Sequence, residues 1–235
     1  MNGEEIGTEG RAFAHLLDGN SYELPWLGKL AWENAVASGF TGDKTVVMGL
    51  DDGPGGQVYL YVGEKQRVGG PVDRAGLSNG KLYGIKVDGF PIENSSNGIP
   101  SGATFTAVDM GNVAVMNGVQ LNTNSINAGV TTFQRPEDGC WDPKNPNDFY
   151  FVTTASFAGN SRLWRLHFND LENPAAGGTI AMLLNGSEGQ KMMDNVAINS
   201  RGQLMALEDV GDNPHVGKIW TYDIPTGAFE MVATA

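Results

Sequence analysis

Cysteine is almost absent from this chain, which has a single one, Cys140, among 235 residues. One cysteine cannot form a disulfide within the chain, so packing has to hold the fold together. Long apolar runs are also missing, and nothing reaches the roughly 18 consecutive apolar residues of a membrane-spanning helix. The first residues, Met1-Asn2-Gly3-Glu4-Glu5, are acidic and polar, and they do not have the form of a signal peptide.

Basic residues are scarce. The chain has 15 Lys and Arg against 27 Asp and Glu, which gives a net charge of −12. Such a charge repels the phosphates of nucleic acids and of anionic membranes, so we expect neither as a partner. It suits a protein that collects cations.

Glycine and short aromatic runs indicate the fold class. The 33 glycines and 11 prolines separate short strand-like segments, which favours an all-β chain rich in turns over a helical one. A length of 235 residues fits one domain. We therefore expect a single all-β domain over residues 1–235.

One pattern occurs three times along the chain. Each copy starts with an acidic segment, and these segments are Trp32-Glu33-Asn34, Pro136-Glu137-Asp138 and Met193-Asp194-Asn195. A strand with a polar end follows, over 44–52, 149–154 and 203–209, and then a second strand with aromatic residues, over 57–63, 162–168 and 218–224. Recurring units of short strands separated by turns are typical of a β-propeller. The strands suffice for about four to five blades.

The remaining segments are less regular. We expect either a strand or a short helix over 11–17 and a strand over 104–108, while the rest of 103–132 stays open between alternatives. Strands are also expected at 179–184 and 228–232, where they would complete the second and third copies.

The repeated acid points to a metal site. The innermost strand of every propeller blade faces the central channel, so an acid at the start of that strand delivers carboxylates from several blades to one place. Hard cations with oxygen ligands are the usual partners of converging carboxylates. The alternative is that Glu33 and Glu137 bind backbone amides near the channel. Asp51 and Asp52, in an Asp-Asp-Gly turn, are either metal ligands or ordinary turn residues.

Several short motifs, in order, resemble the PhoX-type bacterial alkaline phosphatases. They run from about Gly28 to Asp209 and are Gly28-Lys29-Leu30-Ala31-Trp32-Glu33-Asn34-Ala35, Met48-Gly49-Leu50-Asp51-Asp52, Val58-Tyr59-Leu60-Tyr61, Gly80-Lys81-Leu82-Tyr83-Gly84-Ile85-Lys86, Arg135-Pro136-Glu137, Asp194-Asn195 and Arg201-Gly202-Gln203-Leu204.

The resemblance implies a six-bladed, usually exported propeller, periplasmic or secreted, that hydrolyses phosphate monoesters with Ca²⁺ and Fe³⁺. By position, Glu33 and Glu137 resemble the family's metal-bridging glutamates, and Asp52 or Asp51 a metal-binding aspartate. Arg135 resembles the arginine that holds the substrate phosphate. Asp194, Asn195, Glu208 and Asp209 also align with the family pattern, which adds Asp194 and Glu208 to the implied metal ligands.

Two family features have no counterpart in this chain. The segments that carry the family's iron-ligating cysteine are missing, and Cys140 lies in a different context. The stretch with a further phosphate-binding lysine is missing as well. We therefore expect an interior portion or a shortened relative, with the propeller incomplete at both ends.

Two other functions remain open at this stage. One is a non-catalytic propeller stabilised by calcium, with Arg135 paired to a nearby acid. The other is a lactonase-like ester hydrolase, which would share the axial metal without needing Arg135. His15, His167 and His215 lack metal-ligand spacing, and Trp32, Trp141, Trp164 and Trp220 recur at similar places, which favours core packing.

Overall fold

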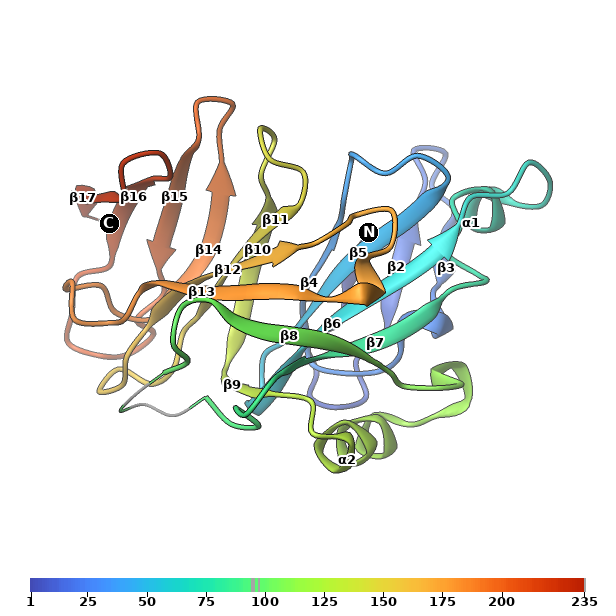
Figure 1. The fold of residues 1–235 in the computed structure, drawn as a ribbon, viewed down its shortest axis with the longest axis horizontal. Coiled ribbons are helices and arrows are strands. Elements are labelled where there is room, and N and C mark those ends of the chain that lie inside the picture. Colours follow the sequence, from blue (N-terminus) through green and yellow to red (C-terminus); the bar gives the residue numbers. More distant parts are fainter. Residues whose placement is uncertain (94–95, 97, 235) are drawn as a thin grey trace.

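The computed structural model describes residues 1–93, 96 and 98–234. Each copy of the repeat forms four antiparallel strands (Figure 1). The first set is β4 (Trp32–Ala37), β5 (Lys44–Asp51), β6 (Pro54–Glu64) and β7 (Lys81–Val87). The second is β10 (Pro136–Trp141), β11 (Asp148–Thr153), β12 (Arg162–Phe168) and β13 (Gly178–Leu184). The third is β14 (Met193–Ile198), β15 (Gln203–Glu208), β16 (Lys218–Asp223) and β17 (Ala228–Thr234). We call these sets the first, second and third blades.

The first strands of the three blades lie next to one another. β10 contacts β4 on one side and β14 on the other. The start of each copy therefore faces a common centre, as expected for the innermost strands of propeller blades. The all-β propeller predicted from the sequence is confirmed.

The first and second blades belong to one continuous sheet. β8 (Ala103–Asp109) pairs with β7 along one edge and with β13 along the other, so hydrogen bonding runs from β4 through to β10. The strand expected at 104–108 is thus present, and it joins two blades. β9 (Thr132–Gln134) pairs with β6 beside this path. The third blade is a separate four-stranded sheet.

The second blade is buried on both faces, which explains the apolar run in β11. Successive side chains of a strand point to opposite faces of its sheet. Phe149 and Phe151 pack in the core shared with the first blade, while Tyr150 and Val152 pack in the core shared with the third. The rings of Phe133 and Phe151 meet edge to face, 5.4 Å apart. Core packing is also confirmed for the four tryptophans, each at most 8% exposed, namely Trp32, Trp141, Trp164 and Trp220.

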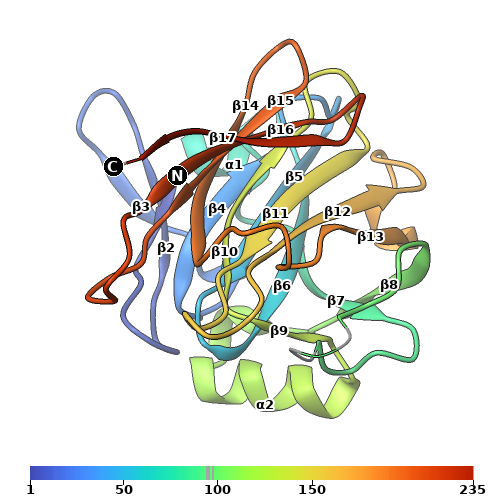
Figure 2. The ribbon, with the colours of Figure 1, turned by 90° about the vertical axis from the view of Figure 1, so that its left-hand side faces the viewer.

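A helix, α2 (Gly118–Ala128), occupies the segment that the sequence left open. It starts at Asn117, whose side chain accepts a hydrogen bond from the Gln120 backbone N–H, and ends at Gly129 in the left-handed region at φ 77°. Leu121 anchors it in a core with Leu82. In Figure 2, α2 lies beneath the strands of the first blade. The other helical elements are short: α1 (Pro71–Arg74), η1 (Pro25–Leu27), η2 (Val113–Val115) and η3 (Pro174–Ala176).

The N-terminal segment forms a small sheet. Its strands are β1 (Asn2–Gly3), β2 (Ala12–His15) and β3 (Ser21–Glu23), so the strand alternative for 11–17 is the correct one. β1 lies against β4 at the start of the first blade.

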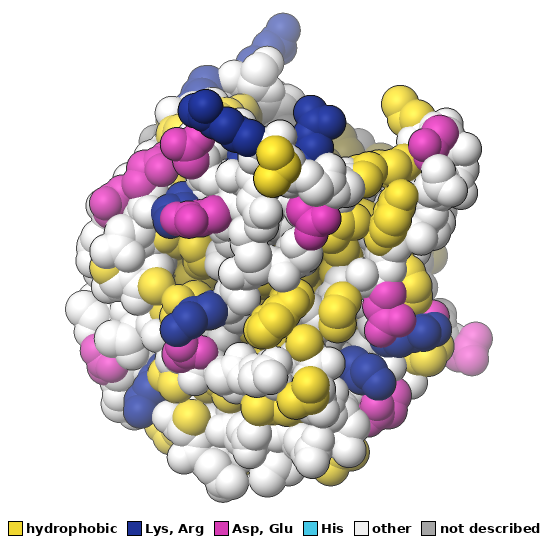
Figure 3. Space-filling model, turned by 90° about the vertical axis from the view of Figure 1, so that its right-hand side faces the viewer, with side chains coloured by type: hydrophobic (Ala, Val, Ile, Leu, Met, Phe, Trp, Pro, Cys, Tyr) yellow, Lys and Arg dark blue, Asp and Glu magenta, His cyan; other side chains and the backbone are white. Residues whose placement is uncertain are grey.

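Charges of both signs lie on the face shown in Figure 3. Its Lys and Arg side chains are scattered, many of them beside Asp or Glu, with apolar side chains between. In the part of the chain that the structure describes, no helix is long and apolar enough to span a membrane.

Candidate metal centre

Three acids, Glu33, Glu137 and Asp194, come together from the three blades. Each offers a carboxylate oxygen, and these oxygens lie within 4.8 Å of one another. They are the acids at the starts of the three repeats, separated by 104 and 57 positions in the sequence, from 33 to 137 and from 137 to 194. The structure therefore brings together the part of the predicted site that rests on the repeat.

Each of these acids lies at a β-bulge. The pairing register shifts between Trp32 and Asn34 in β4, between Pro136 and Gly139 in β10, and between Met193 and Val196 in β14. A bulge leaves a residue out of the ladder and turns its side chain away from the regular alternation. Irregularities at matching positions of three neighbouring strands are what let the acids converge.

Burial and mutual repulsion disfavour the ionised forms of these acids. Burial, with the nearby charge of Asp194, raises the pKa of Glu33 to about 7. Burial, with the charges of Asp52 and Asp194, raises the pKa of Glu137 to about 9. Burial, with the charges of Asp209 and Asp138, raises the pKa of Asp194 to about 6. Such raised pKa values indicate that the cluster has too little positive charge to balance its carboxylates.

Arg135 supplies one positive charge at the edge of the cluster. Its Nε and Nη2 donate to the two oxygens of Asp52 at 2.8 and 2.9 Å, and Nη2 also donates to Glu137 at 2.9 Å. A two-pronged pair with a carboxylate fixes the plane of the guanidinium. The carboxylates of Asp52 and Glu137 thus contact this guanidinium, and the charges of Asp194 and Glu5 lie near it.

The backbone of Arg135 is fixed as well. Its φ of 62° lies in the left-handed region, which is uncommon for a residue with a side chain. The Arg135 carbonyl accepts a hydrogen bond from the Thr154 N–H at 3.0 Å, and the Gln134 carbonyl accepts one from the Ala155 N–H at 2.9 Å. These bonds to the end of β11 hold the side chain at the mouth of the cluster.

Asp138 holds together the strands that carry the cluster, and the sequence did not identify it as a site residue. Its buried carboxylate accepts hydrogen bonds from the Asn34 side chain, from the Gly139 N–H at 2.7 Å and from the Val196 N–H at 3.0 Å. It thereby joins β10 to both neighbouring inner strands. The signal was present, because Asn34, Asp138 and Asn195 each follow the repeated acid.

Asp51 and Glu208 do not join the cluster. They sit at matching ends of β5 and β15, where each accepts a hydrogen bond from the backbone that leads into the blade's first strand. Asp51 Oδ1 accepts from the Ala31 N–H at 3.0 Å, and Glu208 Oε1 accepts from the Lys191 N–H at 2.8 Å. Glu208 also accepts from Lys218 N, from Trp220 Nε1 and from His215 Nε2, so its oxygens are occupied by protein donors. Both side chains hold blade geometry in the structure.

Cysteine and histidine lie elsewhere. Burial raises the pKa of the Cys140 thiol to about 12, which disfavours the thiolate that binds metals. His167 hydrogen-bonds Asp148 and His215 hydrogen-bonds Glu208, while His15 contacts Ser21 and Asn2. These contacts agree with structural or surface roles for the histidines.

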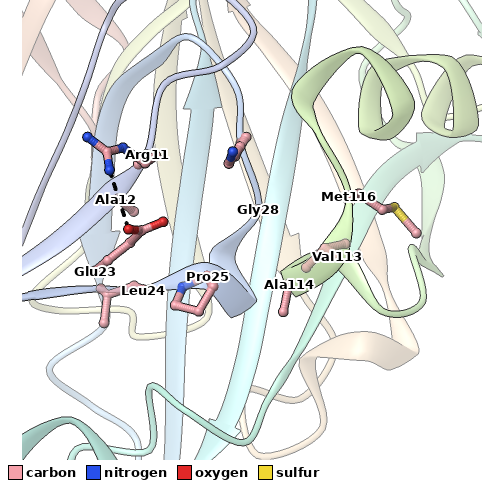
Figure 4. A pocket seen from close by; sticks show the side chains of 10 residues that line it. Arg11, Ala12, Glu23, Leu24, Pro25, Gly28, Val113, Ala114 and Met116 are labelled. Carbon is pink, nitrogen blue, oxygen red and sulfur yellow. Dashed lines mark hydrogen bonds and ion pairs between the residues drawn. The ribbon is translucent and has the colours of Figure 1, made fainter.

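A small hollow lies apart from the cluster, between η1, η2 and β2. Figure 4 shows Arg11 paired with Glu23 at its rim, above Leu24 and Pro25. Its volume of about 20 Å³ suits roughly one water molecule. It is too small for a substrate.

The donor set of the cluster suits a hard cation. Carboxylate oxygens are the ligands that Ca²⁺ and other hard ions prefer, and an added cation would offset the repulsion that raises the three pKa values. The cluster fits a cation because its converging carboxylates outnumber the positive charge beside them.

Comparisons with known proteins show the fold. No family model matches the chain, and no curated protein matches it. Among solved structures, it is similar to PhoX of Pseudomonas fluorescens in complex with vanadate, a transition state analogue, with a TM-score of 0.67 and 15% identity. That match covers 91% of this chain and 46% of the PhoX chain, so the chain spans about half the length of PhoX.

A second match is weaker. A candidate 6-phosphogluconolactonase from Bacteroides uniformis has a TM-score of 0.37 and 11% identity, over 98% of this chain and 66% of that one. The PhoX match shows that the chain has a PhoX-like propeller architecture.

Proposed function

We propose that Glu33, Glu137 and Asp194 hold a hard cation, and that the centre hydrolyses phosphate monoesters with Arg135 as the phosphate-binding residue. The observation that carries this proposal is the convergence of three bulged acids beside a fixed arginine. The PhoX-like fold supports it, because that protein binds vanadate, a transition state analogue. We expect Ca²⁺ in the site, with Fe³⁺ as a further candidate.

The cation would supply Lewis acidity, which stabilises negative charge on phosphoryl oxygens. The protein would position the substrate relative to this cation. Glu137 would act both as a cation ligand and as the hydrogen-bond acceptor of Arg135, which keeps the arginine beside the centre. In the hydrolysis, the bond between phosphorus and the ester oxygen breaks, water provides the new oxygen on phosphorus, and the alcohol leaves with a proton.

Two features of Arg135 support its proposed role in binding the phosphoryl group. Its side chain is 36% exposed, and Nη1 makes only a long contact of 3.4 Å to the Ala155 carbonyl. A planar guanidinium with free N–H groups binds phosphate oxygens well and can stabilise charge that develops during transfer. Once a cation neutralises the acids, an anionic ligand can approach this side chain.

The test is elemental analysis of the purified chain, with turnover of p-nitrophenyl phosphate measured before and after addition of Ca²⁺ and Fe³⁺. We expect the wild type to bind the cation and to hydrolyse p-nitrophenyl phosphate, and Glu137→Gln to lose both properties. Glu230→Gln, which changes an exposed acid on β17, is the matched control and should behave like the wild type. Cation binding that raises the Tm without any turnover would instead identify a calcium-stabilised propeller. Carboxylic ester hydrolysis that survives Arg135→Ala would identify the lactonase-like function.

A further inference from the structure

A second, larger hollow is bordered by Arg135. Its volume is about 380 Å³, and its walls include Ile92, Phe133, Arg135 and Ala155. Small-molecule sites are commonly of about 300–1,000 Å³, mostly apolar, with a few placed polar groups. This hollow has that size and composition, and the proposed hydrolysis assigns no role to it.

The apolar wall is rigid. Phe133 is 1% exposed and packs edge to face on Phe151 and Trp164, with ring centroids 5.4 and 6.0 Å apart. Because Phe133 is held in place, a ligand that enters the hollow does not have to order it. The apolar surface that a ligand can contact comes from residues such as Ile92, which is 63% exposed.

The acid in the wall, Glu93, is already neutralised. One of its oxygens accepts from Arg162 Nη1 at 2.5 Å, and the other accepts from the Gln134 N–H at 3.0 Å. The Glu93 side chain is fully buried and that of Arg162 is 2% exposed, so this pair is internal to the fold. Glu93 therefore does not select a cationic or a polar ligand.

Arg135 lies between the hollow and the acidic cluster. It borders the hollow while its Nε and Nη2 point to Asp52 and Glu137. Ala155, on the same wall, also has a left-handed backbone, with φ 59°. Paired non-glycine residues in this strained region are typical of functional sites, where surrounding contacts hold them in place. A ligand whose anionic end reaches Arg135 would place its remainder in the hollow.

We infer that this hollow binds the alcohol portion of the phosphate ester, and that it selects an aromatic or other apolar group over a polyhydroxylated one. The inference rests on the proposed function, because the phosphoryl end defines which part of the substrate lies here. It adds a substrate class: monoesters of apolar alcohols.

The test measures binding to the Ca²⁺-loaded chain with two non-hydrolysable anions, phenylphosphonate and methylphosphonate, by calorimetry. They share the anionic group and differ in the apolar part. Burying a phenyl group should favour phenylphosphonate about tenfold or more. Ile92→Asp places a charge on the wall at a residue that is 63% exposed, so the fold should tolerate it. This variant should lose most of the preference and keep its affinity for methylphosphonate.

Val119→Asp is the matched control. Val119 is 60% exposed on α2 and does not line the hollow, so the preference should remain. Equal affinity for the two phosphonates, or a preference that survives Ile92→Asp, would overturn the inference and leave the proposed function standing. Failure of both phosphonates to bind the cation-loaded protein would overturn the two together.

Discussion

The carboxylate of Asp138 accepts a hydrogen bond from the backbone N–H of Val196 at 3.0 Å, and this bond joins the second blade to the third. The same carboxylate accepts from Asn34 in the first blade. Because Asn34 follows Glu33 and Val196 lies two positions after Asp194, Asp138 sets the spacing of two cluster acids that it does not touch. It is a positioning residue for the candidate metal centre.

Asp138→Ala should weaken both the fold and the centre. Leaving buried donors without an acceptor costs about 1–3 kcal/mol each, so urea should unfold this variant more easily. We also expect calorimetry to show a several-fold loss of Ca²⁺ affinity. Asp138→Asn keeps an acceptor oxygen and should recover part of both losses. Asp212→Ala, at an exposed acid, is the control, and unchanged Ca²⁺ affinity in Asp138→Ala would show that Asp138 does not position the acids.

The stability of the cation-free protein should fall as pH rises. Burial raises the pKa of Glu137 from 4.5 to about 9 and that of Glu33 from 4.5 to about 7. A carboxyl group with a raised folded-state pKa contributes stability that is fully present below about pH 4.5 and is lost as pH rises through the folded-state value. The Tm in a chelator should therefore drop between pH 5 and 9.

Added Ca²⁺ should reverse that drop, because it binds the ionised carboxylates. The gain in Tm on adding Ca²⁺ should be larger at pH 9 than at pH 5. Glu137→Gln should flatten the pH dependence, while Glu230→Gln should keep the wild-type slope. A cation-free Tm that rises over this range would contradict the cluster as described.

Arg135→Ala should change cation binding and phosphate chemistry in opposite directions. Removing the only guanidinium paired with Asp52 and Glu137 in the described structure leaves a more negative cluster, so Ca²⁺ affinity should increase several-fold. Loss of a group that stabilises transferring charge typically lowers kcat by about 10²–10³. Calorimetry and p-nitrophenyl phosphate turnover measure the two effects. Arg67→Ala, at an exposed arginine, should change neither, and a joint loss of cation and turnover would make Arg135 a structural part of the centre.

The pair of Glu93 and Arg162 should matter for stability far more than surface pairs do. Removing one partner of a buried ion pair typically costs about 3–5 kcal/mol, so Glu93→Ala should lower the free energy of unfolding by that order. The surface pair of Lys44 and Glu64 is the comparison, since Glu64 is 68% exposed and solvent screens such pairs, so its loss should change stability little. Urea unfolding of Glu93→Ala and Glu64→Ala measures both. An equal decrease in the free energy of unfolding in the two variants would contradict this prediction.

The architecture and the core of the site could be predicted from the sequence because both repeat. A carboxylate at the start of each copy, as in Glu33, Glu137 and Asp194, has the same place in every blade, so symmetry brings copies together that are distant in the chain. The bulges that aim these side chains could not be predicted, since register shifts depend on pairing with the next strand.

Features that occur once were harder to predict. α2 contains Asn, Thr and Ser, which have modest helix propensity, and it is fixed by its cap at Asn117 and by the burial of Leu121. Asp51 and Glu208 are acids next to the predicted site, but a single sequence cannot show that a nearby backbone N–H already occupies their oxygens. Pairing of this kind is a property of the assembled blade.

The continuous sheet through β8 makes the first two blades one mechanical body, while the third blade is joined to it by packing and by side-chain hydrogen bonds such as that of Thr154 to the Met193 carbonyl. Glu33 and Glu137 belong to the first body and Asp194 to the second. A cation held by all three would therefore link two separate sheets, in addition to the packing and hydrogen bonds that already join them.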